Sequence, residues 1–413
     1  MSILPLIILL LAMCATGYWY GSKKALSAPL PVRYLSSGNP HQFGLFVVVW
    51  GVLPPAMLFI LWLVFSFLPI DADGSIAQQI DKVVFPALIM LGAAAGLYMA
   101  IREINPKLRV RKSLERCVYA ALLLASTLSV FTTVGIVLSL LFETIQFFEK
   151  VPYSEFFLAL DWSPQTAMRA DQVGSSGSFG AVPLFTGTML ITFIAMIVAV
   201  PLGLMSAIYM TEYASRRFRA TVKPILEILA GIPTVVYGFF AALTVGVFFR
   251  DVGTAIGLDV VTESALAAGV VMGMMIIPFI SSLSDDVIMA VPQNLRDASY
   301  GLGATKSETV LKVIIPAALP GIVGAILLAM SRAIGETMIV VMAAGFAANL
   351  TANPLEAVTT VTVQIVGLLV GDQEFDSAKT LAAFALALTL FVITLCLNVI
   401  ALLVVRKYRE KYD

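Results

Sequence analysis

An arginine and a glutamate stand inside a strongly apolar stretch near residues 317–348. Arg332 and Glu336 are four residues apart, so one continuous helix would place both side chains on one face. Arginine at the centre of a membrane helix costs about 2.5–3.5 kcal/mol, so such a group usually faces a cavity or a partner. The planar guanidinium matches two oxygens of a tetrahedral oxyanion, and Thr337 adds a hydroxyl nearby. We therefore predict that Arg332 contacts an anion and that Glu336 positions it; a purely structural ion pair is the alternative.

A second candidate site lies in the apolar stretch near residues 224–249, where Glu227 precedes the sequence GIPTVVYG at residues 231–238. Pro233 removes a helix hydrogen bond and the glycines on either side weaken the helix, so we expect a break. Membranes tolerate exposed backbone only beside protein or a wet cavity. The residues predicted to line a pathway are Glu227, Pro233, Thr234 and Tyr237. The alternative is a proline kink for packing, with Glu227 at the membrane interface.

A polar loop at residues 284–316 separates two apolar stretches and predicts two short helices. The first runs from about Gln293 to Leu302. The second starts at Thr305, because Thr305 and Glu308 have the spacing of a capping box. A helical elbow beside a membrane suits docking into a groove on another protein. An amphipathic loop lying on the lipid headgroups is the alternative.

The same loop resembles the signature loop of ABC-importer permeases, E-A-A-x3-G-x9-I-x-L-P. The matching residues are Asp297-Ala298-Ser299, then Gly303 after three residues, then Val313-Ile314-Ile315-Pro316 after nine. Asp stands where that family has Glu. In that family the loop sits in a cleft of the ATPase subunit. The resemblance therefore implies that residues 284–316 form a coupling loop, with ATPase contacts at Asp297, Ala298, Leu302, Gly303 and Pro316.

Three further motifs resemble the phosphate-specific members of that family. They are AVPLFTGT at 181–188, GIPTVVYG at 231–238 and RAIGETM at 332–338, and the last resembles the C-type permease subunit. The resemblance covers about residues 180–405 and implies inorganic phosphate as the transported ion. It also implies a second, A-type permease as heterodimer partner, two ATPase subunits that bind ATP and magnesium, and a periplasmic or extracellular phosphate-binding protein. We expect no cofactor in this chain, because GLGATKS at 301–307 lacks the residue order of a phosphate-binding loop.

The composition predicts a polytopic, all-α membrane protein. Of 413 residues, 59% are hydrophobic and 13% are charged, and the mean hydropathy is +0.94. The formal net charge is zero, so no basic surface for nucleic acid is implied. The three cysteines show no metal-ligand spacing, so no metal site is predicted.

Nine apolar stretches are long enough to cross about 30 Å of hydrocarbon. They lie near residues 3–20, 43–69, 83–101, 117–142, 186–211, 224–249, 264–283, 317–348 and 379–405. Residues 1–116 are expected to form a three-span N-terminal extension, in which Gly92 and Gly96 permit close helix packing. Residues 117–413 are expected to form a six-span ABC-importer permease domain that contains the coupling loop.

Lysine and arginine gather in one set of alternate loops, which the positive-inside rule assigns to the cytoplasm. These residues are Lys23, Lys24, Arg33, Arg102, Lys107, Arg109, Arg111, Lys112, Arg116, Arg216, Arg217, Arg219, Lys223, Arg296, Lys306, Lys312, Arg406, Lys407, Arg409 and Lys411. The opposite loops carry only Lys82, Lys150, Arg169 and Arg250. We predict a multi-pass protein of the bacterial cell membrane with its N-terminus outside, and its C-terminus and coupling loop inside.

The function predicted is the permease subunit of an ATP-driven phosphate importer, with ATP hydrolysed by the partner ATPase. A permease for another oxyanion, such as phosphonate or sulfate, is the alternative within transport. A membrane enzyme would need a nucleophile with its base, or a metal cluster, inside the spans, and the sequence shows neither. A membrane sensor would need a soluble output domain, and the inner loops are too short for one.

Overall fold

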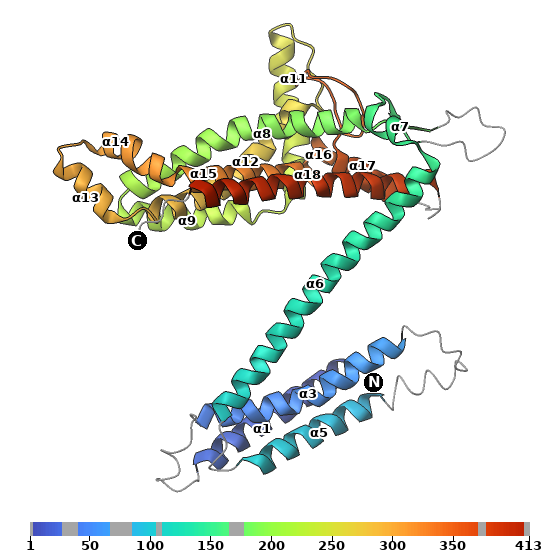
Figure 1. The fold of residues 1–413 in the computed structure, drawn as a ribbon, viewed down its shortest axis with the longest axis vertical. Coiled ribbons are helices and arrows are strands. Elements are labelled where there is room, and N and C mark those ends of the chain that lie inside the picture. The colour runs from blue at the N-terminus through green and yellow to red at the C-terminus, as the bar shows by residue number, and fades with distance from the viewer. Residues whose placement is uncertain are drawn as a thin grey trace, which may run out of the picture. The chain divides into compact units, whose positions relative to one another are not determined.

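The computed structural model describes residues 3–26, 40–66, 85–104, 110–164, 177–370 and 377–408, which are almost entirely helical (Figure 1). The chain forms two compact units, Met1–Thr133 and Val134–Asp413, here called unit 1 and unit 2. The boundary between them falls inside the single long helix α6, Val110–Lys150. The functional division predicted at residue 116 stays a prediction.

Unit 1 is built from closely packed apolar helices. They are α1 (Ile3–Leu26), α3 (Pro40–Ser66), α5 (Phe85–Glu103) and the first part of α6. α3 lies against both α1 and α5, and their shared core includes Phe46, Val47 and Leu97. A Cβ atom at Gly96 would collide with the carbonyl oxygen of Trp50. The close packing predicted for the glycine pair in α5 is therefore confirmed.

Unit 2 has a core of four long helices. They are α8 (Val182–Ile208), α12 (Ala265–Met289), α15 (Ile315–Ile334) and α18 (Ala378–Tyr408). α12 packs against α8 and α15, and α18 packs against α15. Of the helices long and apolar enough to cross a membrane, α12 is the most deeply buried. Its small residues, including Ala267, Ala268 and Gly273, allow the neighbouring backbones to approach closely.

The shorter elements of unit 2 gather at its two ends (Figure 1). At the loop end lie η2 (Tyr209–Tyr213), α9 (Arg216–Ala230), α13 (Gln293–Gly301), α14 (Lys306–Thr309) and η4 (Val310–Ile314). At the opposite end, the hairpin end, lie α7 (Tyr153–Leu158), β1 (Trp162–Ser163), β2 (Ser178–Phe179) and α17 (Val361–Leu369). The two strands are antiparallel, with Trp162 opposite Phe179. The remaining elements are α10 (Thr234–Phe240), η3 (Ala241–Val245), α11 (Gly246–Ala255) and α16 (Met338–Ala343).

Within the described residues, eight helical segments are long and apolar enough to cross a membrane. They are His41–Phe59, Phe85–Glu103, Val110–Lys150, Val182–Tyr213, Thr234–Ala255, Ala265–Met289, Lys306–Ile334 and Ala378–Lys407. The predicted all-α polytopic class is confirmed. The ninth predicted span, near residues 3–20, falls in α1, which is not among these eight segments, and it stays a prediction.

Candidate functional site

The helix that carries Arg332 ends sooner than the sequence predicted. α15 stops at Ile334, where the N–H groups of Gly335 and Glu336 donate three residues back, to Arg332 and Ala333. The prediction that Arg332 and Glu336 lie on one face of a continuous helix is therefore wrong. Glycine weakens the helix at this point, and the carboxylate of Glu336 serves the next helix instead. Its Oε1 accepts from the N–H groups of Met338 (3.2 Å) and Ile339 (3.4 Å), at the start of α16.

Arg332 lies in the last turn of α15, with its guanidinium 5.9 Å from the centre of the Phe279 ring. Among the described residues the guanidinium has no hydrogen bond and no ion pair. The structural Arg332–Glu336 ion pair, which was the alternative, is not formed. The donors of the fork are consequently available to a ligand.

The break predicted around Pro233 is confirmed. α9 ends at Ala230, and Pro233 is the residue directly before α10. The Tyr237 hydroxyl donates to the carbonyl oxygen of Leu229 at 2.9 Å, which satisfies one of the acceptors freed by the break. Thr234 is the first residue of α10.

The two breaks lie side by side. A Cβ atom at Gly238, in α10, would lie 3.0 Å from the carbonyl oxygen of Met338, so α10 and α16 are in contact. The hydroxyl of Thr362, in α17, donates to the carbonyl oxygen of Glu336 at 2.8 Å. Thr188 accepts from the N–H group of Val361 at 3.1 Å. The three motifs at 181–188, 231–238 and 332–338 thus meet around α16 and the start of α17.

Glu227 lies elsewhere than predicted. It belongs to α9, an amphipathic helix with no buried residue, and the membrane-crossing segment begins only at Thr234. Glu227 is exposed and lines a surface groove of about 340 Å³. The groove is shared with Arg216, Arg219, Ala220, Lys223 and Pro224. The prediction that Glu227 lies within a spanning helix is wrong, because the turn at residues 231–233 separates α9 from that helix.

The coupling loop contains the two predicted short helices, α13 and α14. The capping box is confirmed: the Thr305 hydroxyl accepts from the Glu308 N–H, and a Glu308 carboxylate oxygen accepts from the Thr305 N–H at 2.9 Å. Gly303, between the helices, has φ of +84°, a conformation that favours glycine. Leu302 beside it is 90% exposed. The loop therefore presents an apolar tip on a turn that glycine makes possible.

The other predicted coupling residues are all exposed. Asp297 accepts from the Gln293 side chain at 3.1 Å, along one face of α13. Ala298 follows it in the same helix, and Pro316 lies in the first turn of α15. These side chains are available for contact with another protein.

Charged contacts that the sequence analysis missed hold the base of this loop. Asp285, at the end of α12, is completely buried and accepts from Thr211 (2.6 Å), Arg219 (2.8 Å) and Lys223 (2.9 Å). The hydrogen bond to Asp285 raises the pKa of Lys223. We call these four residues the Asp285 cluster. It joins α9 and η2 to α12, where the coupling loop begins.

Arg296 makes a second attachment, from α13. Its guanidinium forms an ion pair with Glu212 in η2 and donates to the carbonyl oxygen of Ile288 at 2.8 Å. The sequence signal for these contacts was the presence of opposite charges in two loops on the same predicted side of the membrane. Their pairing was not foreseen, because the partners are 62 to 84 residues apart.

Residues 199–410 match the family described as binding-protein-dependent transport system inner membrane component, and residues 7–82 match the family described as phosphate ATP-binding cassette transporter. The probable ABC transporter permease protein YqgH of Bacillus subtilis is 34% identical over 243 residues, which are 58% of this chain and 74% of that protein. The phosphate transport system permease protein PstC of Mesorhizobium japonicum is 31% identical over 291 residues, which are 65% of this chain and 82% of that protein.

Among solved structures, a bacterial ABC transporter involved in the import of the acidic polysaccharide alginate aligns with a TM-score of 0.46 and 16% identity. That alignment covers 73% of this chain and 100% of the other. The first family match, residues 199–410, contains both breaks and the whole coupling loop.

Proposed function

Because the chain belongs to the family of binding-protein-dependent transport system inner membrane components, we propose that it is the permease subunit of an ATP-driven importer of inorganic phosphate. Relatives named as phosphate permeases and the match of residues 7–82 support phosphate as the ion. The observation that carries the proposal is the guanidinium of Arg332, which has no hydrogen bond or ion pair with any described residue and lies beside two adjoining helix breaks.

The chemistry of the ion explains why this arrangement suits it. A multiply charged oxyanion that leaves water needs positive charge on its path, because an unpaired charge in a low-dielectric region is prohibitively costly. Arg332 supplies that charge, and its fork binds two oxygens at once. Thr337 and the backbone near Pro233 supply further polar groups at the breaks. The anion therefore contacts Arg332 during transit.

The chain works within a larger assembly. An A-type permease completes the pathway as a heterodimer, and a phosphate-binding protein delivers the anion at the outer face. Two ATPase subunits bind ATP and magnesium and hydrolyse the nucleotide. They engage the coupling loop at Asp297, Ala298 and the exposed Leu302–Gly303 turn. Closure of the ATPases is then transmitted through the Asp285 cluster and Arg296 to α9 and α12.

The charge distribution supports an orientation in which the loop end faces the cytoplasm, the hairpin end faces outward, the N-terminus lies outside and the C-terminus lies inside. Two exposed positions test this assignment in a background without native cysteines. Val370→Cys should react with an impermeant thiol reagent from outside, and Asn294→Cys only from inside. Labelling of position 294 from outside would overturn both the orientation and the coupling proposal.

The alternative substrate is another oxyanion, such as sulfate or a phosphonate. Uptake of labelled phosphate into vesicles that contain the whole complex separates these cases. We expect unlabelled phosphate to abolish uptake of the label, and sulfate or a phosphonate in equal excess to leave most of it. Stronger competition by sulfate or by the phosphonate would reassign the substrate.

A further inference from the structure

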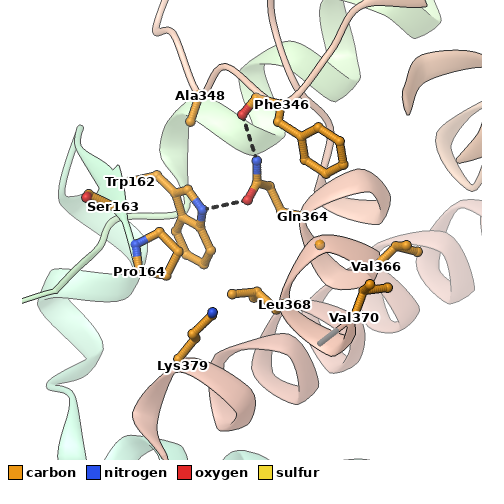
Figure 2. Close-up of a pocket in the computed structure, with 11 residues that line it drawn as sticks. Trp162, Ser163, Pro164, Phe346, Ala348, Gln364, Val366, Leu368, Val370 and Lys379 are labelled. Atoms are coloured by element: carbon orange, nitrogen blue, oxygen red, sulfur yellow. Dashed lines mark hydrogen bonds between the residues drawn. The ribbon is translucent and has the colours of Figure 1, made fainter. Parts of the chain in front are cut away.

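A buried hydrogen bond at the hairpin end joins two parts of unit 2 that are 202 residues apart in the sequence (Figure 2). The indole Nε1 of Trp162, in β1, donates to the Oε1 of Gln364, in α17, at 3.0 Å. Each of the two residues is only 8% exposed. Loss of such a bond is destabilising, because a buried polar group without a partner keeps the desolvation penalty and has no hydrogen bond to offset it.

The amide nitrogen of Gln364 makes two further bonds. Nε2 donates to the carbonyl oxygen of Phe346 at 3.0 Å and to the hydroxyl of Thr359 at 3.3 Å (Figure 2 shows the first of these). Phe346 directly follows Gly345, which has φ of +82° and makes the turn after α16. Gln364 therefore fixes three segments relative to one another: the hairpin, the turn after α16 and the approach to α17.

Helix α17 also contacts the helix break that follows Arg332. Thr362, two residues before Gln364, donates to the carbonyl oxygen of Glu336 at 2.8 Å. Because both residues lie in the first turns of α17, a shift of Gln364 moves Thr362 with it. One short, rigid stretch of helix thus connects the hairpin to the backbone of the break that follows Arg332.

Apolar packing alone does not set the position of the hairpin on α17. Trp162 and Phe179 share a hydrophobic cluster with Val361 and Leu368, but such contacts are not directional. On one side of the hydrogen bond lies a cavity of about 580 Å³, lined in part by Trp162, Leu368 and Lys379 (Figure 2). The indole can shift toward this space, so the hydrogen bond is what fixes its place.

We propose that Trp162 and Gln364 are positioning residues. They transmit the docking of the phosphate-binding protein, here called the delivery protein, from the hairpin end to the break between α15 and α16 at Glu336. This inference rests on the proposed function, because it requires the hairpin end to face outward and the break to line the anion path. Docking displaces the hairpin, the Trp162–Gln364 bond carries the displacement into α17, and Thr362 passes it to the carbonyl group of Glu336. Arg332 then receives the anion only when a loaded delivery protein is in place.

The test uses the whole complex in lipid vesicles. Trp162→Phe keeps an aromatic ring in the cluster and removes only the N–H donor. We expect basal ATPase activity and the affinity for the delivery protein to stay unchanged. ATPase activity stimulated by the phosphate-loaded delivery protein should fall about tenfold, the size expected for loss of one buried hydrogen bond. Val370→Ala is the matched control: it alters the lining of the same cavity without touching the bond, and stimulation should remain.

A second variant distinguishes a connected chain of bonds from two separate effects. Thr362→Val keeps the shape of the side chain and removes the bond to Glu336. If the bonds act in series, the double variant with Trp162→Phe should be no worse than the poorer single variant. Losses that multiply in the double variant would overturn the inference.

Two other results would also overturn it: an equal fall of basal and stimulated activity in Trp162→Phe, and a fall only in affinity for the delivery protein. Absence of stimulation in the unaltered complex would count against the proposed function, whereas an unaltered ratio of stimulated to basal ATPase activity in Trp162→Phe would count against the inference. Uptake of labelled phosphate by the unaltered complex tests the proposed function separately, so the two can fail independently.

Discussion

Asp285 at the loop end and Arg332 beside the helix breaks are both charged side chains at the ends of long apolar helices, but their surroundings differ. Asp285 is completely buried and accepts from three side chains, one in η2 and two in α9. Arg332 is exposed within the isolated chain and bonds to none of the described residues. A charge with all its partners in place holds elements together, because moving it would leave a buried ion unpaired. A charge without partners is available to a ligand.

The largest effect that follows from this comparison concerns Arg332. Arg332→Gln should lower the uptake of labelled phosphate at least about a hundredfold, the size expected for loss of two charge-assisted hydrogen bonds. The complex should still assemble and hydrolyse ATP, because Arg332 makes no hydrogen bond or ion pair with another described residue. Arg332→Lys keeps the charge and loses the fork, so it should retain intermediate uptake. Near-normal uptake by Arg332→Gln would instead assign the counter-charge to the partner permease.

At the loop end, loss of the paired charge should destabilise the protein. Asp285→Ala leaves Arg219 and Lys223 without their acceptor and should cost about 2–3 kcal/mol, below the value for a fully buried pair because both cations are partly exposed. Thermal unfolding of the purified complex measures this cost. The matched control is Asp286→Ala, which removes an exposed neighbour that also contacts Lys223 and should cost about 0.5 kcal/mol or less. Equal effects of the two substitutions would show that the buried Asp285 holds these elements together no more than the exposed Asp286 does.

A smaller effect is expected at the tip of the coupling loop, where attachment depends on shape instead of charge. Gly303→Arg places a side chain on a backbone with positive φ, which costs about 1–2 kcal/mol. We expect the protein to remain in the membrane and its affinity for the ATPase to fall about tenfold or more, as measured by co-purification. Gly301→Ala, at a helical position with open space around it, should bind the ATPase normally. Normal co-purification of Gly303→Arg would contradict docking through this turn.

The smallest effect is expected at Glu336. Glutamine at this position keeps the oxygen that accepts from the Met338 and Ile339 N–H groups, so the start of α16 is preserved. No ion pair with Arg332 is lost, and uptake should stay within about threefold of the unaltered protein. A loss as large as that of Arg332→Gln would show that Glu336 acts on the guanidinium or on the anion after all.

Local features of this fold could be predicted from the sequence, whereas contacts between distant residues could not. The Thr305–Glu308 capping box and the break at Pro233 depend on residues a few positions apart, and both were predicted correctly. The pairing of Arg332 with Glu336 was wrong because helical spacing assumes a continuous helix, which Gly335 interrupts. The Asp285 cluster and the Trp162–Gln364 bond join residues 62 to 202 positions apart, and one sequence gives no sign of which charges or amides will meet.

The position of Arg332 in the last turn of α15 also bears on how tightly an anion is held. The peptide dipoles of a helix place a partial negative charge at its C-terminal end, and this charge stabilises a cation there by about 0.3–1 kcal/mol. The same partial charge repels an anion that approaches the guanidinium. The end of α15 therefore weakens anion binding at Arg332 without any contribution from a neighbouring carboxylate. An anion held by a guanidinium at a helix C-terminus leaves more readily than one held by the same group elsewhere, and rapid release is what transport requires of a site along its path.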